Sequence, residues 1–381
     1  MSISKKICIL TSVHPVFDTR VFHKEAKTLA NAGYDVTLVA QHHKDETING
    51  IKIIALPKPK NRFERFIRLD YLTYKKALNQ KADVYHFHDP ELLPWIVKLK
   101  RKTKAKIIYD IHENIPSQIL TKLWIPRILR KPLSKFYQSK EKKILPFIDW
   151  IILAEDSYLK IYKNYQNISV IKNYPLISKE SFPNETEYRH KTPELVYVGG
   201  VSRERGLFEM LKTIKILKQK FNNIKLKIIG TIDTKTKLQM NNIINSYKIK
   251  NNIIIYGKIP HPKIFNLLSQ SNIGLCILHP TPNYIKSLAT KILEYMIAKL
   301  PVIASNFPLW EKIVEGNDCG ICVDPLKPKK IAEAIEYLIE HPSEAKQMGG
   351  NGKKAVLEKY NWENESKKLL EIYKNMASPE P

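Results

Sequence analysis

The chain repeats one pattern along its length, in which a short apolar run is followed by a segment with helical spacing. The first instance is Lys6–Ser12, followed by a predicted helix over residues 21–32. Gly33 suits the end of that helix, and residues 34–40 are the next apolar run. This order predicts a β-α-β unit, the opening of a doubly wound parallel sheet.

The same pattern continues and then restarts after an interruption. Strands are predicted at residues 51–56, 84–88, 107–111 and 150–154, and again at 194–198, 225–230, 253–256, 273–277 and 302–304. Residues 174–193 between the two sets are polar and contain several prolines. A chain of 381 residues exceeds one typical core, so we predict two Rossmann-like domains, 1–173 and 194–360, joined by the 174–193 linker.

Composition narrows the function classes. The formal net charge of +26 predicts attraction to polyanions, unless the lysines are spread evenly over solvated faces. Apolar runs are too short for a membrane-spanning helix, and polar residues follow the first apolar run too soon for a signal peptide. Four cysteines fit a reducing compartment, and Cys319-x-x-Cys322 has no second ligand pair for zinc. We therefore expect a cytoplasmic protein.

Several nucleotide signatures are absent. The first β-α turn contains no glycine, so the G-x-G-x-x-G pattern of dinucleotide-binding enzymes is missing. The chain also lacks a D-x-D triplet, so no obvious divalent clamp for a pyrophosphate is present. A nicotinamide or flavin enzyme is not expected.

Two predicted strands end in clusters of histidines and acids. Residues 86–91 read HFHDPE, and residues 110–114 read DIHEN. Such clusters at the carboxyl ends of strands bind a metal or form hydrogen bonds to substrate hydroxyl groups. Ordinary loop polarity is the alternative interpretation.

Two stretches, 58–81 and 120–143, mix cationic residues with aromatic and aliphatic ones. This mixture is typical of a segment that lies on an anionic membrane surface. A solvated helix that packs its apolar side on the sheet is the competing interpretation. Nucleic acid is not an expected partner, because no known nucleic-acid-binding motif accompanies the charge.

Two segments of the second half suit a phosphorylated ligand. Gly199-Gly200 lies between a strand and a helix, with Arg203 and Arg205 beside it, and such a turn lets a diphosphate approach closely. Residues 284–305 predict one helix, ended by Pro301, and then a buried strand. That helix carries Glu294, which either has a functional role or pairs with a neighbouring lysine on a solvated surface.

The two halves, the Gly-Gly turn and the element EYMIAKLPVIAS together resemble the retaining glycosyltransferases of family 4. The resemblance covers nearly the whole chain. It implies the GT-B fold, an α/β architecture of two Rossmann-like doubly wound domains that face each other across a cleft. It also implies that the final helix, residues 361–376, packs back on the N-terminal domain.

The resemblance implies a role for individual donor-side residues. Arg205 before Gly206 matches the family's phosphate loop, whereas a second family arginine falls on Gly200. One of the two usual diphosphate cations is therefore either missing or supplied by Arg203. Glu294 matches the glutamate that binds the donor ribose, but the family's first glutamate falls on Lys286. The implied catalytic residues are His112, Arg205 and Glu294. The implied donor-binding residues are Gly199, Gly200, Arg203, Arg205, Gly230, Lys258, Ile259, Lys286, Ser287, Leu288, Thr290, Lys291 and Glu294.

The acceptor side is expected in the N-terminal half. Its candidates are Asp18, Arg20, His88, Asp89 and Glu113. The implied reaction is metal-independent, cofactor-free transfer from a nucleoside-diphosphate sugar, UDP before GDP, with retention at the anomeric carbon. The expected acceptor is a saccharide or a lipid-linked glycan at the inner face of the cell membrane, in cell-surface polysaccharide assembly. A UDP-sugar 2-epimerase of the same fold and a non-catalytic nucleotide-sugar-binding protein are the alternatives.

Overall fold

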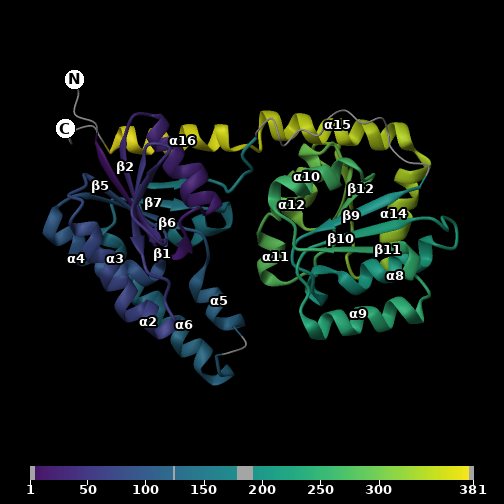
Figure 1. Cartoon of the computed structure of the whole chain (residues 1–381), viewed down its shortest axis with the longest axis horizontal. Helices are drawn as coiled ribbons and strands as arrows, with labels where there is room; N and C mark the ends of the chain where they lie inside the picture. The colour runs from purple at the N-terminus through teal and green to yellow at the C-terminus, as the bar shows by residue number, and fades with distance from the viewer. Residues whose placement is uncertain (1–4, 123–124, 178–191, 377–381) are drawn as a thin grey trace. The chain divides into compact units, whose positions relative to one another are not determined.

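The computed structural model describes residues 5–122, 125–177 and 192–376, so residues 178–191 of the predicted linker lie outside the described residues. The chain forms two compact units (Figure 1). The N-terminal unit comprises Met1–Asn173 and Trp362–Pro381, and the C-terminal unit comprises Tyr174–Asn361.

The N-terminal unit is built on an eight-stranded sheet of order β3-β4-β2-β1-β5-β6-β7-β8. All neighbours are parallel except β3 and β4, which are antiparallel. The strands are β1 (Lys6–Pro15), β2 (Asp35–Gln41), β3 (Glu46–Ile48), β4 (Ile51–Leu56), β5 (Val84–Phe87), β6 (Lys106–Ile111), β7 (Trp150–Leu153) and β8 (Ile168–Val170). The short edge strands β3 and β8 were not predicted from the apolar runs.

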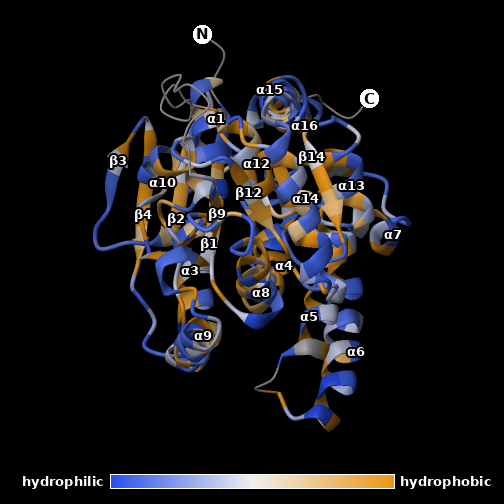
Figure 2. Ribbon diagram, turned by 90° about the vertical axis from the view of Figure 1, so that its right-hand side faces the viewer, coloured by the Kyte–Doolittle hydropathy of each residue, from blue (hydrophilic) through white to orange (hydrophobic). Residues whose placement is uncertain are grey.

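Both faces of this sheet are buried, which explains its nearly continuous apolar strands. Side chains alternate along β1, so Cys8 and Leu10 belong to one core and Ile7 and Ile9 to the other. Figure 2 shows the hydrophobic strands between helices of mixed character. The principal helical segments are η1 (Thr19–Ala26), α1 (Lys27–Asn31), α2 (Arg62–Glu64), η2 (Arg65–Leu69), α3 (Asp70–Leu78), α4 (Leu93–Thr103), α5 (Ile115–Thr121), α6 (Arg127–Ile144), α7 (Leu159–Tyr162) and α16 (Trp362–Asn375).

The C-terminal unit contains a fully parallel six-stranded sheet of order β11-β10-β9-β12-β13-β14. The strands are β9 (Glu194–Val198), β10 (Lys225–Ile229), β11 (Ile253–Gly257), β12 (Ile273–Cys276), β13 (Val302–Ser305) and β14 (Gly320–Val323). The strand order reverses between β9 and β12, where such sheets bind ligands beyond the carboxyl ends of their strands.

Helices cover both faces of this sheet as well. Leu195 and Tyr197 of β9 belong to one core, and Val196 and Val198 belong to the other. The helical segments are η7 (Arg203–Arg205), α8 (Leu207–Leu217), α9 (Thr234–Ser246), α10 (His261–Ser269), α11 (Pro282–Lys286), α12 (Thr290–Ile297), α13 (Pro308–Val314), α14 (Pro328–Glu340) and α15 (Pro342–Glu358).

The predicted single helix before Pro301 is wrong, because α11 and α12 are separate. The Thr281 side chain caps α11 by accepting from the Tyr284 amide, and Ser287 adopts an extended conformation after Lys286. Trp310 Nε1 donates to the Ser287 carbonyl at 2.8 Å, which holds the break in place. Ser287 and Leu288 therefore lie between helices, and Lys291 and Glu294 lie on α12.

The C-terminal helix α16 is part of the N-terminal unit. Leu369 and Ile372 are buried in the same core as Ile7 and Leu29, and Trp362 Nε1 donates to Thr28 Oγ1 at 2.9 Å. Within the described part of the chain, no helix combines the length and the apolar character needed to cross a membrane.

We predict that Leu369→Ala lowers the free energy of unfolding of the N-terminal unit by about 3 kcal/mol, because it leaves a cavity in a fully buried site. Urea denaturation, followed by hydrogen exchange of β1 and of β9, measures this separately for the two units. Lys367→Ala, at an exposed position of α16, is the control and should change little. Equal destabilisation of both units would contradict the assignment of α16.

Candidate functional site

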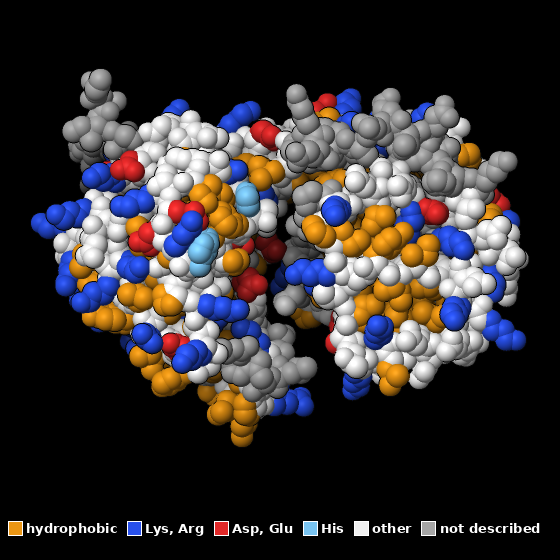
Figure 3. Space-filling view, in the orientation of Figure 1, with side chains coloured by type: hydrophobic (Ala, Val, Ile, Leu, Met, Phe, Trp, Pro, Cys, Tyr) orange, Lys and Arg blue, Asp and Glu red, His pale blue; other side chains and the backbone are white. Residues whose placement is uncertain are grey.

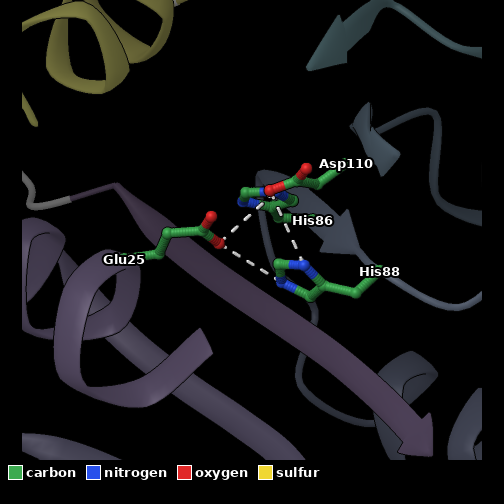
Figure 4. Close-up of side chains that lie close together, drawn as sticks. All are labelled: Glu25, His86, His88 and Asp110. Atoms are coloured by element: carbon green, nitrogen blue, oxygen red, sulfur yellow. Dashed lines mark ion pairs between the residues drawn. The ribbon is translucent and has the colours of Figure 1, made fainter. Parts of the chain in front are cut away.

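Four ligand-type side chains converge at the carboxyl edge of the N-terminal sheet. Glu25 comes from η1, His86 from β5, His88 from the residue after β5, and Asp110 from β6 (Figure 4). All four are buried, and donor atoms from the four lie within 4.8 Å of one another. Two neighbouring parallel strands and the helix after β1 thus bring together the histidines and acids predicted at two strand ends.

Arg20 supplies the positive charge of this cluster. Its Nη2 donates to Asp110 Oδ2 at 2.8 Å and to Oδ1 at 3.1 Å, and its Nε lies 2.9 Å from Glu25 Oε1. Arg20 Nη1 donates to the carbonyl of Ile171 at 3.0 Å. Burial favours a raised pKa for Asp110, but Arg20 and His112 outweigh it and hold that pKa well below its usual range.

Burial shifts the pKa values of the remaining members of the cluster. Burial, reinforced by Asp110, raises the pKa of Glu25 well above its ordinary value. Burial lowers the pKa of His86 to about 4 and that of His88 well below its ordinary value, so both imidazoles are neutral at pH 7. Arg20 thus faces both carboxyl groups, while the two histidines add no charge.

A chain of close contacts leads from this cluster to His112. His88 Nε2 lies 3.3 Å from Glu25 Oε2, and His88 Nδ1 lies 3.1 Å from His112 Nε2. Asp110 Oδ1 lies 3.5 Å from the same His112 nitrogen. His112 is half-buried, and its contacts with the buried His88 and Asp110 fix the orientation of its ring.

The donor set of the cluster is of a kind that binds transition metals. Arg20 already contacts both carboxyl groups, and the Tyr373 hydroxyl lies 2.9 Å from His86 Nδ1. A divalent cation at this point would also lie close to a fixed guanidinium charge. We therefore assign Arg20, and not a metal ion, as the cation that faces the carboxyl groups of Asp110 and Glu25.

The other acceptor-side candidates have distinct surroundings. Asp18 caps η1 by accepting from the amides of Arg20 and Val21. Asp89 Oδ2 accepts from Thr11 Oγ1, from the Ser12 amide and from the Val13 amide, which fixes the second half of β1. His14 lies between these two acids, 3.5 Å from Asp18 Oδ2 and 3.6 Å from Asp89 Oδ1. Glu113 is exposed. Arg20 is buried and contacts Asp110 and Glu25.

The C-terminal unit has a second polar site at the turn after β9. Gly199 has φ +124°, a backbone conformation that side-chain-bearing residues rarely adopt. Tyr197 Oη donates to the Gly200 carbonyl at 2.7 Å, and the Gly199 amide donates to the Ile229 carbonyl at 2.8 Å. A Cβ atom at Gly199 would lie 3.0 Å from Lys291 Nζ and 3.4 Å from Arg205 Nη1, so two cations flank this turn.

Lys291 is the more deeply buried of the two cations. Its residue is 8% exposed, and its Nζ lies 3.9 Å from the centre of the Tyr197 ring. Within the described part of the chain, Lys291 Nζ has no hydrogen-bond partner. Burial, with a contribution from Arg205, lowers the pKa of Lys291 to about 8.

The other donor-side candidates are less closely gathered around this turn. Glu294 is half-buried one turn after Lys291 on α12, and Gly230 follows β10, where a Cβ atom would lie 1.8 Å from the Gly199 carbonyl oxygen. Arg203 is exposed, with its guanidinium over the Phe208 ring at 5.1 Å. Three further candidates are exposed, and three are half-buried. The exposed ones are Lys258, Lys286 and Thr290, and the half-buried ones are Ile259, Ser287 and Leu288.

Glu25 and Tyr197 were not among the predicted site residues, and His86 was predicted only as a member of the 86–91 cluster. Glu25 could have been found as an acid five residues after Arg20 on the apolar side of a predicted helix. His86 could have been assigned with His88, because alternate residues of a strand point to the same face. Tyr197 lies inside an apolar strand, and apart from its hydroxyl group nothing in the sequence indicates a role in the site.

Comparison with known families identifies the chain. The family model "Glycosyltransferase Family 4" matches residues 19–173, and the model "Glycosyl transferases group 1" matches residues 178–355. The chain belongs to the family 4 glycosyltransferases. The family predicted from the sequence is thereby confirmed.

The individual relatives of this chain are distant in sequence. The capsular polysaccharide biosynthesis glycosyltransferase CapM of Staphylococcus aureus is 26% identical over 166 residues, which are 43% of this chain and 41% of CapM. The chain spans about half the length of CapM and of the next relatives that it matches.

Solved structures show the fold. Sucrose-phosphate synthase from Thermosynechococcus elongatus superposes with a TM-score of 0.77 at 17% identity, over 98% of this chain and 99% of that one. Anabaena HepE in complex with UDP superposes with a TM-score of 0.72 at 10% identity, over 98% and 100% of the two chains. The predicted GT-B fold with two Rossmann-like domains is confirmed.

We predict that Arg20→Met destabilises the N-terminal unit by about 3–5 kcal/mol, because it leaves buried carboxyl groups without their cation. Arg68→Met is the matched control, since Arg68 is 76% exposed and pairs with Glu64 at the surface. That control should change stability by less than about 1 kcal/mol. Urea denaturation of both variants measures the difference, and equal effects would contradict the assigned role of Arg20.

Proposed function

We propose that the protein transfers a sugar from a nucleoside-diphosphate donor to a saccharide or lipid-linked acceptor, with retention at the anomeric carbon, in cell-surface polysaccharide assembly. The observation that carries this proposal is the glycine turn after β9 with Arg205 and Lys291 beside it. Family membership supports glycosyl transfer. UDP as the nucleotide is supported by HepE, which was solved with UDP and with UDP-glucose.

In this proposal, Gly199 and Gly200 let the diphosphate approach the backbone, and Arg205 stabilises the charge that develops on the leaving group. Glu294 accepts hydrogen bonds from the ribose hydroxyls. His112 contacts the transferred sugar, oriented by His88 and Asp110. The half-buried His14 and Asp18 bind the acceptor: the His14 and His112 ring centres are 5.7 Å apart, and Asp18 lies 3.5 Å from His14.

A thermal-shift panel of UDP, GDP, ADP and dTDP tests the donor site. We expect one nucleotide class, UDP first, to raise the melting temperature of the wild type. The shift should be lost in Glu294→Ala, because the ribose hydroxyls lose their acceptor.

Glu333→Ala, which removes a carboxylate from an exposed ion pair of α14, is the control and should keep the full shift. If none of the four nucleotides stabilised the wild type, the proposed donor site would be wrong. In a separate incubation with a UDP-sugar, interconversion of that sugar without any acceptor would favour the epimerase instead.

The N-terminal unit also has a surface suited to an anionic membrane, and we include this surface in the proposal. Segments 58–81 and 120–143 expose large apolar side chains among lysines and arginines, and Figure 3 shows these two kinds of side chain intermixed on this unit. Leu123 and Trp124 of the second segment lie outside the described residues. The exposed apolar residues are Phe63, Phe66, Ile67, Tyr71, Leu120, Ile128, Leu129, Leu133 and Phe136.

Helix α6 gives the strongest support for a membrane-binding surface. Ile128 is 83% exposed and Phe136 is 59% exposed, while Lys131, Lys135 and other cations of the same helix are exposed beside them. A helix that only packs its apolar side on the sheet would bury such side chains. Apolar insertion together with attraction to anionic headgroups is the physical basis of peripheral binding at the inner face of the cell membrane.

We predict that Ile128→Asp combined with Phe136→Asp reduces binding to phosphatidylglycerol-containing vesicles by more than about tenfold, because it removes apolar insertion and adds repulsion. Co-sedimentation at two salt concentrations measures this. Leu238→Asp, at a 65% exposed position of the C-terminal unit, is the matched control and should bind as the wild type does. A wild type that does not sediment with anionic vesicles would contradict the membrane surface.

A further inference from the structure

We propose that Lys291 supplies the second cation for the donor diphosphate, taking the place of the family arginine that Gly200 replaces. The inference rests on the proposed function, because it names a binding residue of the same site. It differs from the family pattern in its origin: the cation comes from the first turn of α12 and not from the loop after β9.

The placement of Lys291 is the first observation. Its side chain is buried, and its Nζ lies over the Tyr197 ring, 3.9 Å from the ring centre. One added atom at Gly199 would touch Lys291 Nζ at 3.0 Å and approach Arg205 Nη1 at 3.4 Å. The two cationic groups therefore flank the same glycine, where a small phosphate oxygen can approach and a side chain cannot.

The charge around Lys291 is the second observation. The charged and titratable groups that face it are Arg205 of η7, Cys276 of β12, Glu294 of its own helix and Tyr197 of β9. Burial raises the pKa of the Cys276 thiol to about 12, and burial also raises the pKa of Tyr197, so both are neutral. Arg205 repels the ammonium group. Of these four groups, Glu294 alone carries negative charge, against two cations.

A buried ammonium group without a hydrogen bond is unfavourable unless something else requires it. A diphosphate provides the missing partner, since a lysine binds phosphate oxygens as a compact point charge. Its negative charge also relieves the repulsion between Lys291 and Arg205. The same arrangement explains why the chain tolerates the loss of the loop arginine at Gly200.

The proposal has a measurable proton signature. The pKa of Lys291 is lowered to about 8 in the free protein, and a bound diphosphate raises it again. At a pH near 8.5, nucleotide binding should therefore take up a fraction of a proton. The affinity should fall as the pH rises from 7 to 9.5, because the ammonium group loses its proton across that interval.

Isothermal titration calorimetry of the full chain with UDP, in Tris and in HEPES buffers, measures both affinity and proton uptake. We expect Lys291→Met to weaken UDP binding by about 10- to 100-fold and to abolish the proton uptake. Lys291→Arg should retain most of the affinity but show no proton uptake and no fall in affinity above pH 8, because arginine stays protonated. Lys237→Met, at an exposed position of α9, is the control and should match the wild type.

Each outcome decides the question. Unchanged UDP affinity and proton uptake in Lys291→Met would overturn the inference while leaving the proposed function intact. Binding of none of UDP, GDP, ADP or dTDP to the wild type would overturn the proposed function and this inference together. Should Lys291→Met fail to fold, the loss of proton uptake in Lys291→Arg still decides the role of Lys291.

Discussion

The buried guanidinium of Arg20 is the interaction on which the N-terminal unit depends. It joins η1 to β6 through Asp110, to Glu25 on its own helix and to the backbone at Ile171. Because this single cation satisfies Asp110, the nearby histidines can remain neutral, and His88 can hold His112. The orientation of the half-buried His112 is therefore a consequence of charge balance several ångströms beneath it.

The polar site of the C-terminal unit differs from the N-terminal cluster in its balance of charges. Its cations at the Gly199 turn exceed the local negative charge, whereas in the N-terminal cluster Arg20 contacts two carboxyl groups. An excess of buried positive charge costs stability in the free protein, and an anionic ligand recovers that cost. The same parallel-sheet architecture thus holds a buried cation between two carboxyl groups in one unit, and an excess of positive charge beside a glycine turn in the other.

Most strands of both sheets could be located from the sequence, because strands that are buried on both faces are continuous apolar runs. It did not reveal β3, β8 or β14, which are short and lie at or beside sheet edges. It joined α11 to α12, because the contact from Trp310 that holds the break is distant in sequence. The buried state of Lys291 was also not predictable from the sequence, since it depends on which strands become neighbours.

Hydrogen–deuterium exchange of the full chain, with and without a saturating amount of the best-binding nucleotide, tests the central claim most directly. The account predicts protection in peptides that cover residues 199–206 and 290–294, where the glycine turn, Arg205, Lys291 and Glu294 lie. Peptides of the buried Arg20 cluster should exchange equally in both states. Protection that spared residues 199–206 and 290–294 would contradict the account.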